Sequence, residues 1–137
     1  MAWKFTLCVE TSVEAFHLVR KVLGTMVDIA GGSEEDAIDA ECAVGEALLN
    51  AHRHAYQGKP GPLEVQVAYS CGDNALHVLV SDQGPPRETT PQVPTGFPSP
   101  PAGWGLYLIG QLMDEVEIVH PARDGRGTTI RMVKVLS

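Results

Sequence analysis

The chain has 137 residues, of which 44% are hydrophobic and 20% are charged, and its formal net charge is −7. These values are typical of one folded domain and exclude a disordered segment. The acidic balance excludes non-specific binding to nucleic acid, which needs Lys and Arg against the phosphates. No apolar run approaches the roughly 20 residues that cross a bilayer. Cys8, Cys42 and Cys71 are widely separated, so we expect reduced thiols in a cytoplasmic protein.

The first half of the chain is predicted to hold one strand and two helices. Alternating character predicts a strand over residues 3–9. Apolar residues at three- and four-residue steps predict a helix that is capped by Thr11 or Ser12 and runs to about residue 30. A capping-box pattern and acidic residues then predict a second helix over residues 33–56.

The second half is predicted to hold two hairpins with a helix between them. These elements are expected at residues 63–69, 75–82, 106–113, 115–120 and 128–135. A Pro-, Thr- and Gly-rich loop over residues 83–103 separates the first hairpin from the helix, and long loops of this kind are commonly lids or binding loops.

Together these elements predict one domain over residues 1–137. Strands joined by hairpins favour a mixed, mostly antiparallel sheet with the helices on one face, which is a two-layer α/β (α+β) sandwich. Four large side chains are expected in its core: Trp3, Phe5, Phe16 and Ile109.

A polar stripe marks the second predicted helix. Glu46, Asn50 and His54 stand four residues apart on a segment otherwise rich in Ala and Leu, so they share one helix face. A carboxylate and a carboxamide one turn apart supply the oxygen ligands that Mg²⁺ prefers and a proton acceptor for a general base. A solvated helix face would use the same residues, and the helix alone does not decide between the two.

The long loop has a candidate motif at each end. Asp82 and Gly84 follow an apolar strand, where a carboxylate can accept a hydrogen bond from an exocyclic amine and a glycine lets a flat ring approach. An ordinary turn uses the same residues. Gly103 and Gly105 precede the apolar helix that begins at Leu106, where free N–H groups could face an anion.

A fourth motif begins the last strand, where Thr128 could set a hydroxyl near a pocket. The four motifs occur in one order over nearly the whole chain, and this order resembles the Bergerat ATP-binding fold of the GHKL (histidine kinase-like) superfamily. Residues 46–56 and 105–116 further resemble the anti-sigma-factor serine/threonine kinases, which are small stand-alone bacterial members of that superfamily.

The resemblance implies an ATP-dependent serine/threonine protein kinase. Such a kinase phosphorylates a small anti-anti-sigma (STAS-type) protein, also binds a sigma factor, and commonly works as a homodimer that switches partners. By the same resemblance Glu46 would be the general base, Asn50 would coordinate the Mg²⁺ that bridges the ATP phosphates, and Asp82 would bind the adenine amino group.

The remaining motif residues would complete the nucleotide site. Gly84 would lie against the adenine ring with Thr128 nearby. Gly103 and Gly105, with Leu106 after them, would carry a lid over the phosphates. All of these roles are implied by the resemblance alone.

The lid, at about residues 83–105, departs from the family pattern in two ways. Pro86 stands where a second glycine is usual, and the segment from Glu88 to Trp104 contains no Lys or Arg. Phosphoryl transfer develops negative charge that a cation would stabilise, so Arg53, Arg87 or a partner residue would have to supply it.

Three functions therefore stay open. The first is the active kinase, which the Glu46 carboxylate favours. The second is a nucleotide-binding regulatory switch with little or no kinase activity, which the lid without a cation favours. The third is a histidine kinase catalytic domain that acts in trans, because the chain has no room for phosphoacceptor helices.

Overall fold

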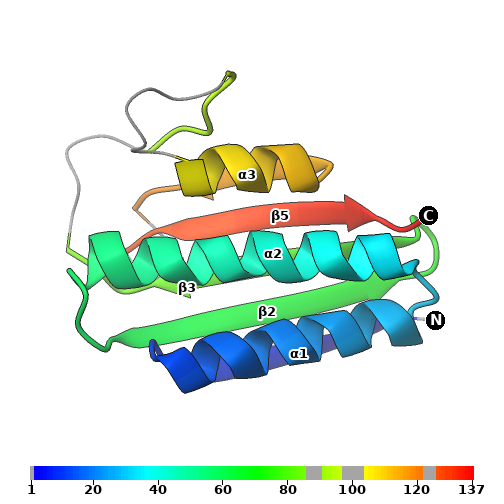
Figure 1. Cartoon of the computed structure of the whole chain (residues 1–137), viewed down its shortest axis with the longest axis horizontal. Coiled ribbons are helices and arrows are strands. Elements are labelled where there is room, and N and C mark those ends of the chain that lie inside the picture. Colours follow the sequence, from blue (N-terminus) through cyan, green and yellow to red (C-terminus); the bar gives the residue numbers. More distant parts are fainter. Residues whose placement is uncertain (1, 86–90, 97–103, 122–125) are drawn as a thin grey trace.

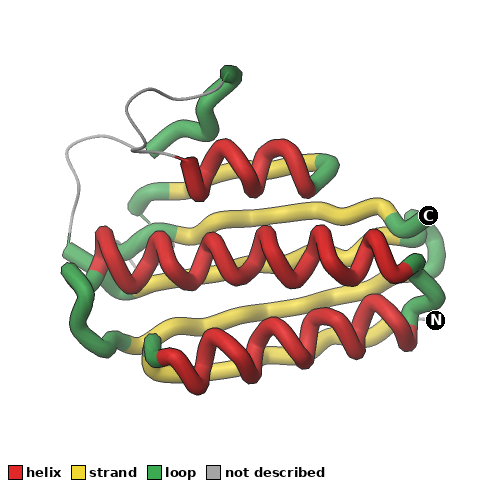
Figure 2. Tube along the Cα trace, in the orientation of Figure 1, coloured by secondary structure: helices red, strands yellow, loops and turns green. Residues whose placement is uncertain are grey.

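The computed structural model describes residues 2–85, 91–96, 104–121 and 126–137. These residues form a five-stranded sheet, three α-helices and one π-helix (Figures 1 and 2). In chain order the elements are β1 (Ala2–Glu10), α1 (Val13–Ile29), α2 (Glu34–Asn50), η1 (Ala51–Ala55), β2 (Pro62–Ser70), β3 (Ala75–Asp82), α3 (Trp104–Leu112), β4 (Glu115–Val119) and β5 (Thr129–Val135). No helix in the described ranges is long and apolar enough to cross a membrane.

The sheet has the strand order β1-β2-β3-β5-β4, and all four described pairings are antiparallel. The three α-helices lie on one face of it, so the predicted two-layer sandwich is confirmed (Figure 1). The parallel pairing that a mixed sheet would contain is absent among these strands. Hairpins explain this arrangement, because β2–β3 and β4–β5 are each joined directly and so must run antiparallel.

The core fills the space between the sheet and the helices. On β2 the buried side chains alternate from Leu63 to Tyr69, as expected for a strand with one covered face. Three fully buried residues of α1 meet them at helical spacing: Val19, Leu23 and Val27. Burying each such side chain stabilises the fold by about 1.5–3 kcal/mol.

Of the four expected core residues, Phe5 is the exception. Ile109 is fully buried, and Trp3 and Phe16 are partly buried against the core. Phe5 is 52% exposed, although its register partner Val67 places it on the helix-covered side of the sheet. The reason is position in the sheet, since β1 is an edge strand and the Phe5 ring has a neighbouring strand on one side only.

The helix ends follow the predicted caps with one difference. Ser12 caps α1 by accepting a hydrogen bond from the Ala15 N–H at 3.0 Å, and Thr11 is buried beside it. The second helix does not continue regularly to residue 56. It changes at Ala51 into η1, a π-helical turn, and such turns are often found at functional sites.

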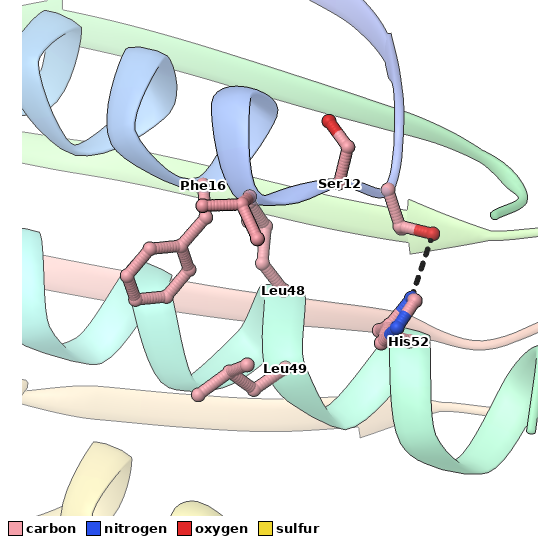
Figure 3. A pocket seen from close by; sticks show the side chains of 7 residues that line it. Ser12, Phe16, Leu48, Leu49 and His52 are labelled. Atoms are coloured by element: carbon pink, nitrogen blue, oxygen red, sulfur yellow. Dashed lines mark hydrogen bonds between the residues drawn. The ribbon is translucent and has the colours of Figure 1, made fainter. Parts of the chain in front are cut away.

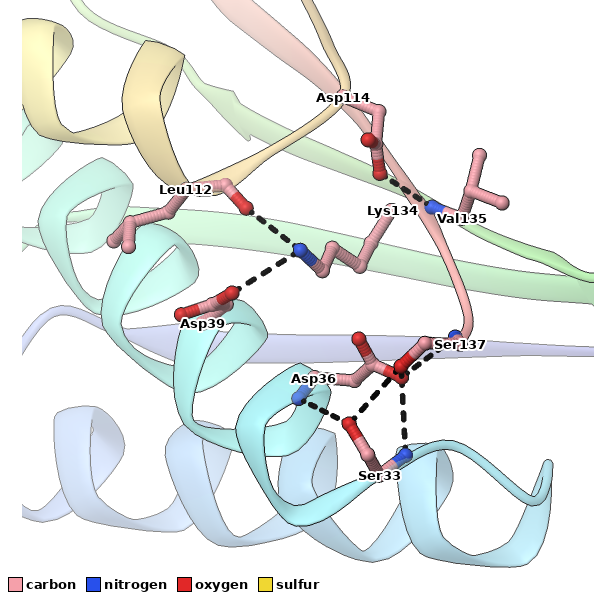
Figure 4. Close-up of polar contacts among 8 residues, drawn as sticks. All are labelled: Ser33, Asp36, Asp39, Leu112, Asp114, Lys134, Val135 and Ser137. Carbon is pink, nitrogen blue, oxygen red and sulfur yellow. Dashed lines mark hydrogen bonds and ion pairs between the residues drawn. The ribbon is translucent and has the colours of Figure 1, made fainter.

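A polar cluster ties the C-terminus to the start of α2 (Figure 4). The Asp36 carboxylate accepts hydrogen bonds from the backbone N–H groups of Ser33 at 3.0 Å and Ser137 at 2.9 Å, and from the Ser137 hydroxyl. Nearby, the Lys134 ammonium donates to Asp39 at 3.1 Å and to the Leu112 carbonyl oxygen at 3.0 Å. Residues a hundred positions apart are thereby held together.

The two ends of the described chain lie at the same end of the molecule (Figure 1). Ala2 pairs with Ser70, and Val135 pairs with Ala75, so both ends lie beside the β2–β3 turn. The opposite end of the sheet holds Asp82 and the exit toward the long loop.

Replacing Asp36 with Asn is expected to lower the free energy of unfolding by about 1 kcal/mol at pH 7. Burial acts to raise the pKa of the Asp36 carboxyl, yet the hydrogen bonds from Ser137 and Ser33 outweigh it and hold that pKa below its ordinary value of 3.8. The ionised form therefore stabilises the fold above about pH 4, and this stabilisation is lost as the pH falls through the lowered pKa.

Urea unfolding of the wild type and of Asp36→Asn between pH 3 and pH 7 checks this. The difference between them should shrink toward the acidic end. Glu35→Gln is the matched control, because Glu35 is an exposed acid in the same helical turn. Equal losses in both variants would contradict the role of the cluster.

Candidate functional site

Asp82 ends β3 with its side chain only 5% exposed. Its Oδ1 atom accepts hydrogen bonds from the backbone N–H groups of Gly84 at 2.9 Å and Thr128 at 3.1 Å, and its own N–H donates to the Thr128 carbonyl oxygen. Within the described part of the chain Oδ2 accepts none. A buried carboxylate is thus satisfied on one oxygen, and its other oxygen is left as an acceptor for a ligand.

Gly84 brings the Asp82 turn against the end of the long helix. A Cβ atom built on Gly84 would lie 2.6 Å from the Ala55 Cβ. The π-helical turn of η1 ends at Ala55, so the widened last turn of the helix contacts the backbone that follows β3. Only a residue without a side chain allows this approach.

The Tyr56 side chain links the start of β2 to the segment after β3 through two hydrogen bonds. Its hydroxyl donates to the Pro62 carbonyl oxygen and accepts a hydrogen bond from the Gln83 N–H at 2.8 Å. Burial raises the pKa of the Tyr56 hydroxyl, and the negative charge of Asp82 adds to that rise. The ring therefore stays neutral and keeps both hydrogen bonds.

Gly127 and His120 complete the surroundings of Thr128. The fourth sequence motif began at Gly127 but gave it no role of its own, and no motif included His120. Gly127 has φ +77°, and a Cβ atom there would overlap the Asp82 carbonyl oxygen. The His120 Nδ1 atom lies 2.7 Å from the Gly127 carbonyl oxygen and 3.0 Å from Thr128 Oγ1. A glycine before Thr128 was a usable signal, whereas nothing local to His120 predicts its contact.

Glu46 faces the start of α3. A Cβ atom built on Gly105 would lie 3.0 Å from Glu46 Oε2, so the carboxylate lies directly against the glycine backbone. Leu106 is buried in the core, which leaves its backbone N–H as the group it can offer a ligand. Gly103 lies outside the described residues.

The structure thus brings the predicted residues together in two groups. Glu46 meets Gly105, and Asp82 meets Gly84 and Thr128. Asn50, half-buried at the end of α2, lies between them along the helix. From Glu46 to Ala55 the helix rises roughly 13 Å.

A separate cavity of about 180 Å³ lies between α1 and α2 (Figure 3). It is mostly apolar, and His52, one of its lining residues, contacts Thr11 at 3.1 Å between Nδ1 and Oγ1. Its lining residues are Thr11, Ser12, Val13, Phe16, Leu48, Leu49 and His52. None of the predicted site residues is among them, so this cavity lies apart from the two groups.

The sequence profile of the histidine kinase-like ATPase domain matches residues 9–134. The chain belongs to this family. Relatives in it include the serine-protein kinase RsbW of Bacillus licheniformis, which is 31% identical over 139 residues covering 90% of this chain and 80% of the relative. RsbW of Staphylococcus aureus is also 31% identical, over 93% of this chain and 84% of its own. This histidine kinase-like domain is therefore one of the RsbW-type serine-protein kinases.

Solved structures show the same fold. The RsbU and RsbW domains of a Mycobacterium tuberculosis protein match 98% of this chain and 32% of their own, with a TM-score of 0.70 at 24% identity. The histidine kinase domain of an Erythrobacter litoralis blue-light activated histidine kinase matches with a TM-score of 0.58 at 20% identity. The fold class predicted from the motifs is confirmed.

In this histidine kinase-like domain, Gly84→Ala is expected to lower the free energy of unfolding by about 1–3 kcal/mol. The new methyl group would force the Asp82 turn away from Ala55. Urea unfolding followed by circular dichroism measures the loss. Gly96→Ala is the matched control, because a Cβ atom on Gly96 meets nothing within 4 Å. If both variants unfold alike, the close approach at Gly84 does not hold.

Proposed function

We propose that this chain is an ATP-dependent serine/threonine protein kinase and anti-sigma regulator in the bacterial cytoplasm. It phosphorylates an anti-anti-sigma (STAS-type) protein, binds a sigma factor, and switches between these partners as a homodimer. The observation that carries the proposal is the position of Glu46, whose carboxylate lies against the Gly105 backbone at the start of α3. The names of its RsbW relatives support the reaction class.

The Asp82 group fits the base of the nucleotide. Its Oδ2 atom accepts no hydrogen bond in the described chain, and an exocyclic amino group is a donor that such an oxygen can use. Gly84 follows Asp82 closely in the chain, and because its Cβ direction is filled by Ala55, only its backbone is available to lie against a flat ring. We therefore assign the adenine ring to Asp82, Gly84 and Thr128.

The Glu46 group fits the phosphates. Asn50 would offer its amide oxygen to Mg²⁺, which usually takes only one or two protein ligands beside phosphate oxygens and water. The described residues contain no group of three or more His, Cys, Asp or Glu able to hold a metal ion, which agrees with such sparse coordination. When bound, ATP supplies the γ-phosphoryl group, and Mg²⁺ offsets its negative charge.

Glu46 performs the proton transfer in this proposal. Its carboxylate takes the proton from the serine or threonine hydroxyl of the partner as that oxygen attacks the γ-phosphorus of ATP and ADP leaves. Gly105 leaves the carboxylate accessible, because a side chain there would crowd Oε2. The N–H groups of Gly105 and Leu106 lie in the first turn of α3, where a helix leaves its donors to groups outside it, and we assign them to phosphate oxygens. The family resemblance assigns Gly103 to the same role, and that residue lies outside the described part of the chain.

A second candidate is a nucleotide-binding switch with little or no kinase activity. Residues 88–104 contain no Lys or Arg, so the lid itself offers no cation to the phosphates. Arg126 donates to the Gln83 carbonyl oxygen on the Asp82 side. Arg53 is exposed on η1, three residues after Asn50, and is the described cation nearest to Asn50 in the chain.

ATP binding should respond differently to three substitutions. Asp82→Asn should weaken binding about 10- to 100-fold, because a charge-assisted hydrogen bond is replaced by a donor facing a donor. Asn50→Ala should remove the dependence of affinity on Mg²⁺, and Glu46→Ala should still bind. Isothermal titration with a non-hydrolysable ATP analogue, with and without Mg²⁺, measures this.

Asp73→Asn, at the far turn between β2 and β3, is the control and should bind as the wild type does. A wild type that binds no ATP at millimolar concentration would overturn the nucleotide site and leave a partner-binding domain. Unaltered affinity in Asp82→Asn would instead move the adenine ring elsewhere.

Phosphoryl transfer tests the reaction itself. Glu46→Ala should slow transfer to a purified anti-anti-sigma partner about 100-fold or more. Arg53→Ala should also slow transfer, whereas Arg53→Lys, which keeps the positive charge, should not. Radiolabelled ATP and phosphoamino acid analysis measure both rate and acceptor. Phosphate on histidine would favour a histidine kinase domain acting in trans, and ATP binding without any transfer would favour the switch.

A further inference from the structure

His120 follows β4 and reaches across to the start of β5. Its Nδ1 atom lies 2.7 Å from the Gly127 carbonyl oxygen. A carbonyl oxygen can only accept, so Nδ1 carries a proton and donates it. The same N–H faces Thr128 Oγ1 at 3.0 Å, and at this contact the hydroxyl can act only as an acceptor.

The proton of the Thr128 hydroxyl must then point elsewhere. Within the described ranges Thr128 Oγ1 makes no hydrogen bond besides the one from His120. The residue is 3% exposed, and a buried hydroxyl proton without an acceptor is costly. Its neighbour Asp82 instead has an unused acceptor in the described chain, because Oδ1 accepts two N–H groups and Oδ2 accepts none.

Thr128 and Asp82, which are hydrogen-bonded to each other, thus offer one hydroxyl donor and one carboxylate acceptor. The Asp82 N–H donates to the Thr128 carbonyl oxygen at 2.9 Å, and the Thr128 N–H donates to the Asp82 side-chain Oδ1 at 3.1 Å, so the two residues are held next to each other. Adenine carries an amino donor next to its N1 acceptor. Guanine carries a carbonyl acceptor next to an N1–H donor, which reverses the order.

We propose that His120 is a positioning residue that turns the Thr128 hydroxyl proton toward N1 of a bound adenine. This inference rests on the proposed nucleotide site and adds the device that reads N1. In this proposal the imidazole does not contact the nucleotide. Its Nδ1–H donates to Thr128 Oγ1, so the hydroxyl directs its own proton to the base.

A ligand that lacks only N1 tests this directly. For the wild type, 1-deaza-ATP should bind about three- to tenfold more weakly than ATP, which is the effect of one neutral hydrogen bond. In His120→Leu this difference should disappear. In His120→Asn, whose amide nitrogen can occupy the position of Nδ1, the difference should return.

His77→Leu is the matched control, since that ring contacts Asp73 on the uncovered face of the sheet. Thr128→Val gives a second route if His120→Leu does not fold, as judged by circular dichroism, because removing the hydroxyl should also abolish the difference. A merely structural role for His120 would weaken ATP and 1-deaza-ATP equally.

Two results would overturn the inference. One is a wild type that binds both ligands equally, and the other is a His120→Leu protein that keeps the full difference. Failure of the proposed function looks distinct from both, because the wild type would then bind neither ligand.

Discussion

The buried carboxylate of Asp82 is the constraint that shapes the end of the sheet where β3, β5 and η1 meet. An ionised carboxylate taken out of water destabilises a protein by several kcal/mol unless hydrogen bonds replace the lost hydration. Here the replacement comes from the backbone N–H groups of Gly84 and Thr128. Each can reach Oδ1 only because the chain turns tightly, at Gly84 against Ala55 and at Gly127 with positive φ. One charge therefore determines how β3, β5 and η1 meet.

The same arrangement makes α2 a rigid support. At its start, Ser33 and Ser137 hold the Asp36 carboxylate, and at its end η1 is pressed against the Asp82 turn. Glu46 lies between these two anchors, on a helix that can neither slide nor tilt without breaking one of them. Reacting groups need positions held to fractions of an ångström. A helix anchored at both ends holds the backbone of Glu46 in place, and Gly105 lies against its carboxylate.

Much of this architecture could be predicted from local patterns. Strand alternation and the capping box at Ser33 depend on residues a few positions apart, and the structure confirms both. The spacing of Glu46 and Asn50 is equally local, and both residues lie on α2 as predicted. Contacts between distant residues could not be predicted. Asp36 and Ser137 are 101 positions apart, and no rule of spacing joins them. The exposure of Phe5 likewise depends on β1 being an edge strand.

The placement of the chain ends has a consequence for how this domain can be built into larger proteins. Ala2 and Val135 lie beside the β2–β3 turn, whereas Asp82 is at the other end of β3, about 23 Å away along the strand. A polypeptide fused to either end would be attached at the end of the sheet remote from the proposed nucleotide site. The Mycobacterium tuberculosis chain, of which this fold covers 32%, has RsbU and RsbW domains in one polypeptide. A connection at this end would leave the opposite end of the sheet accessible to another protein.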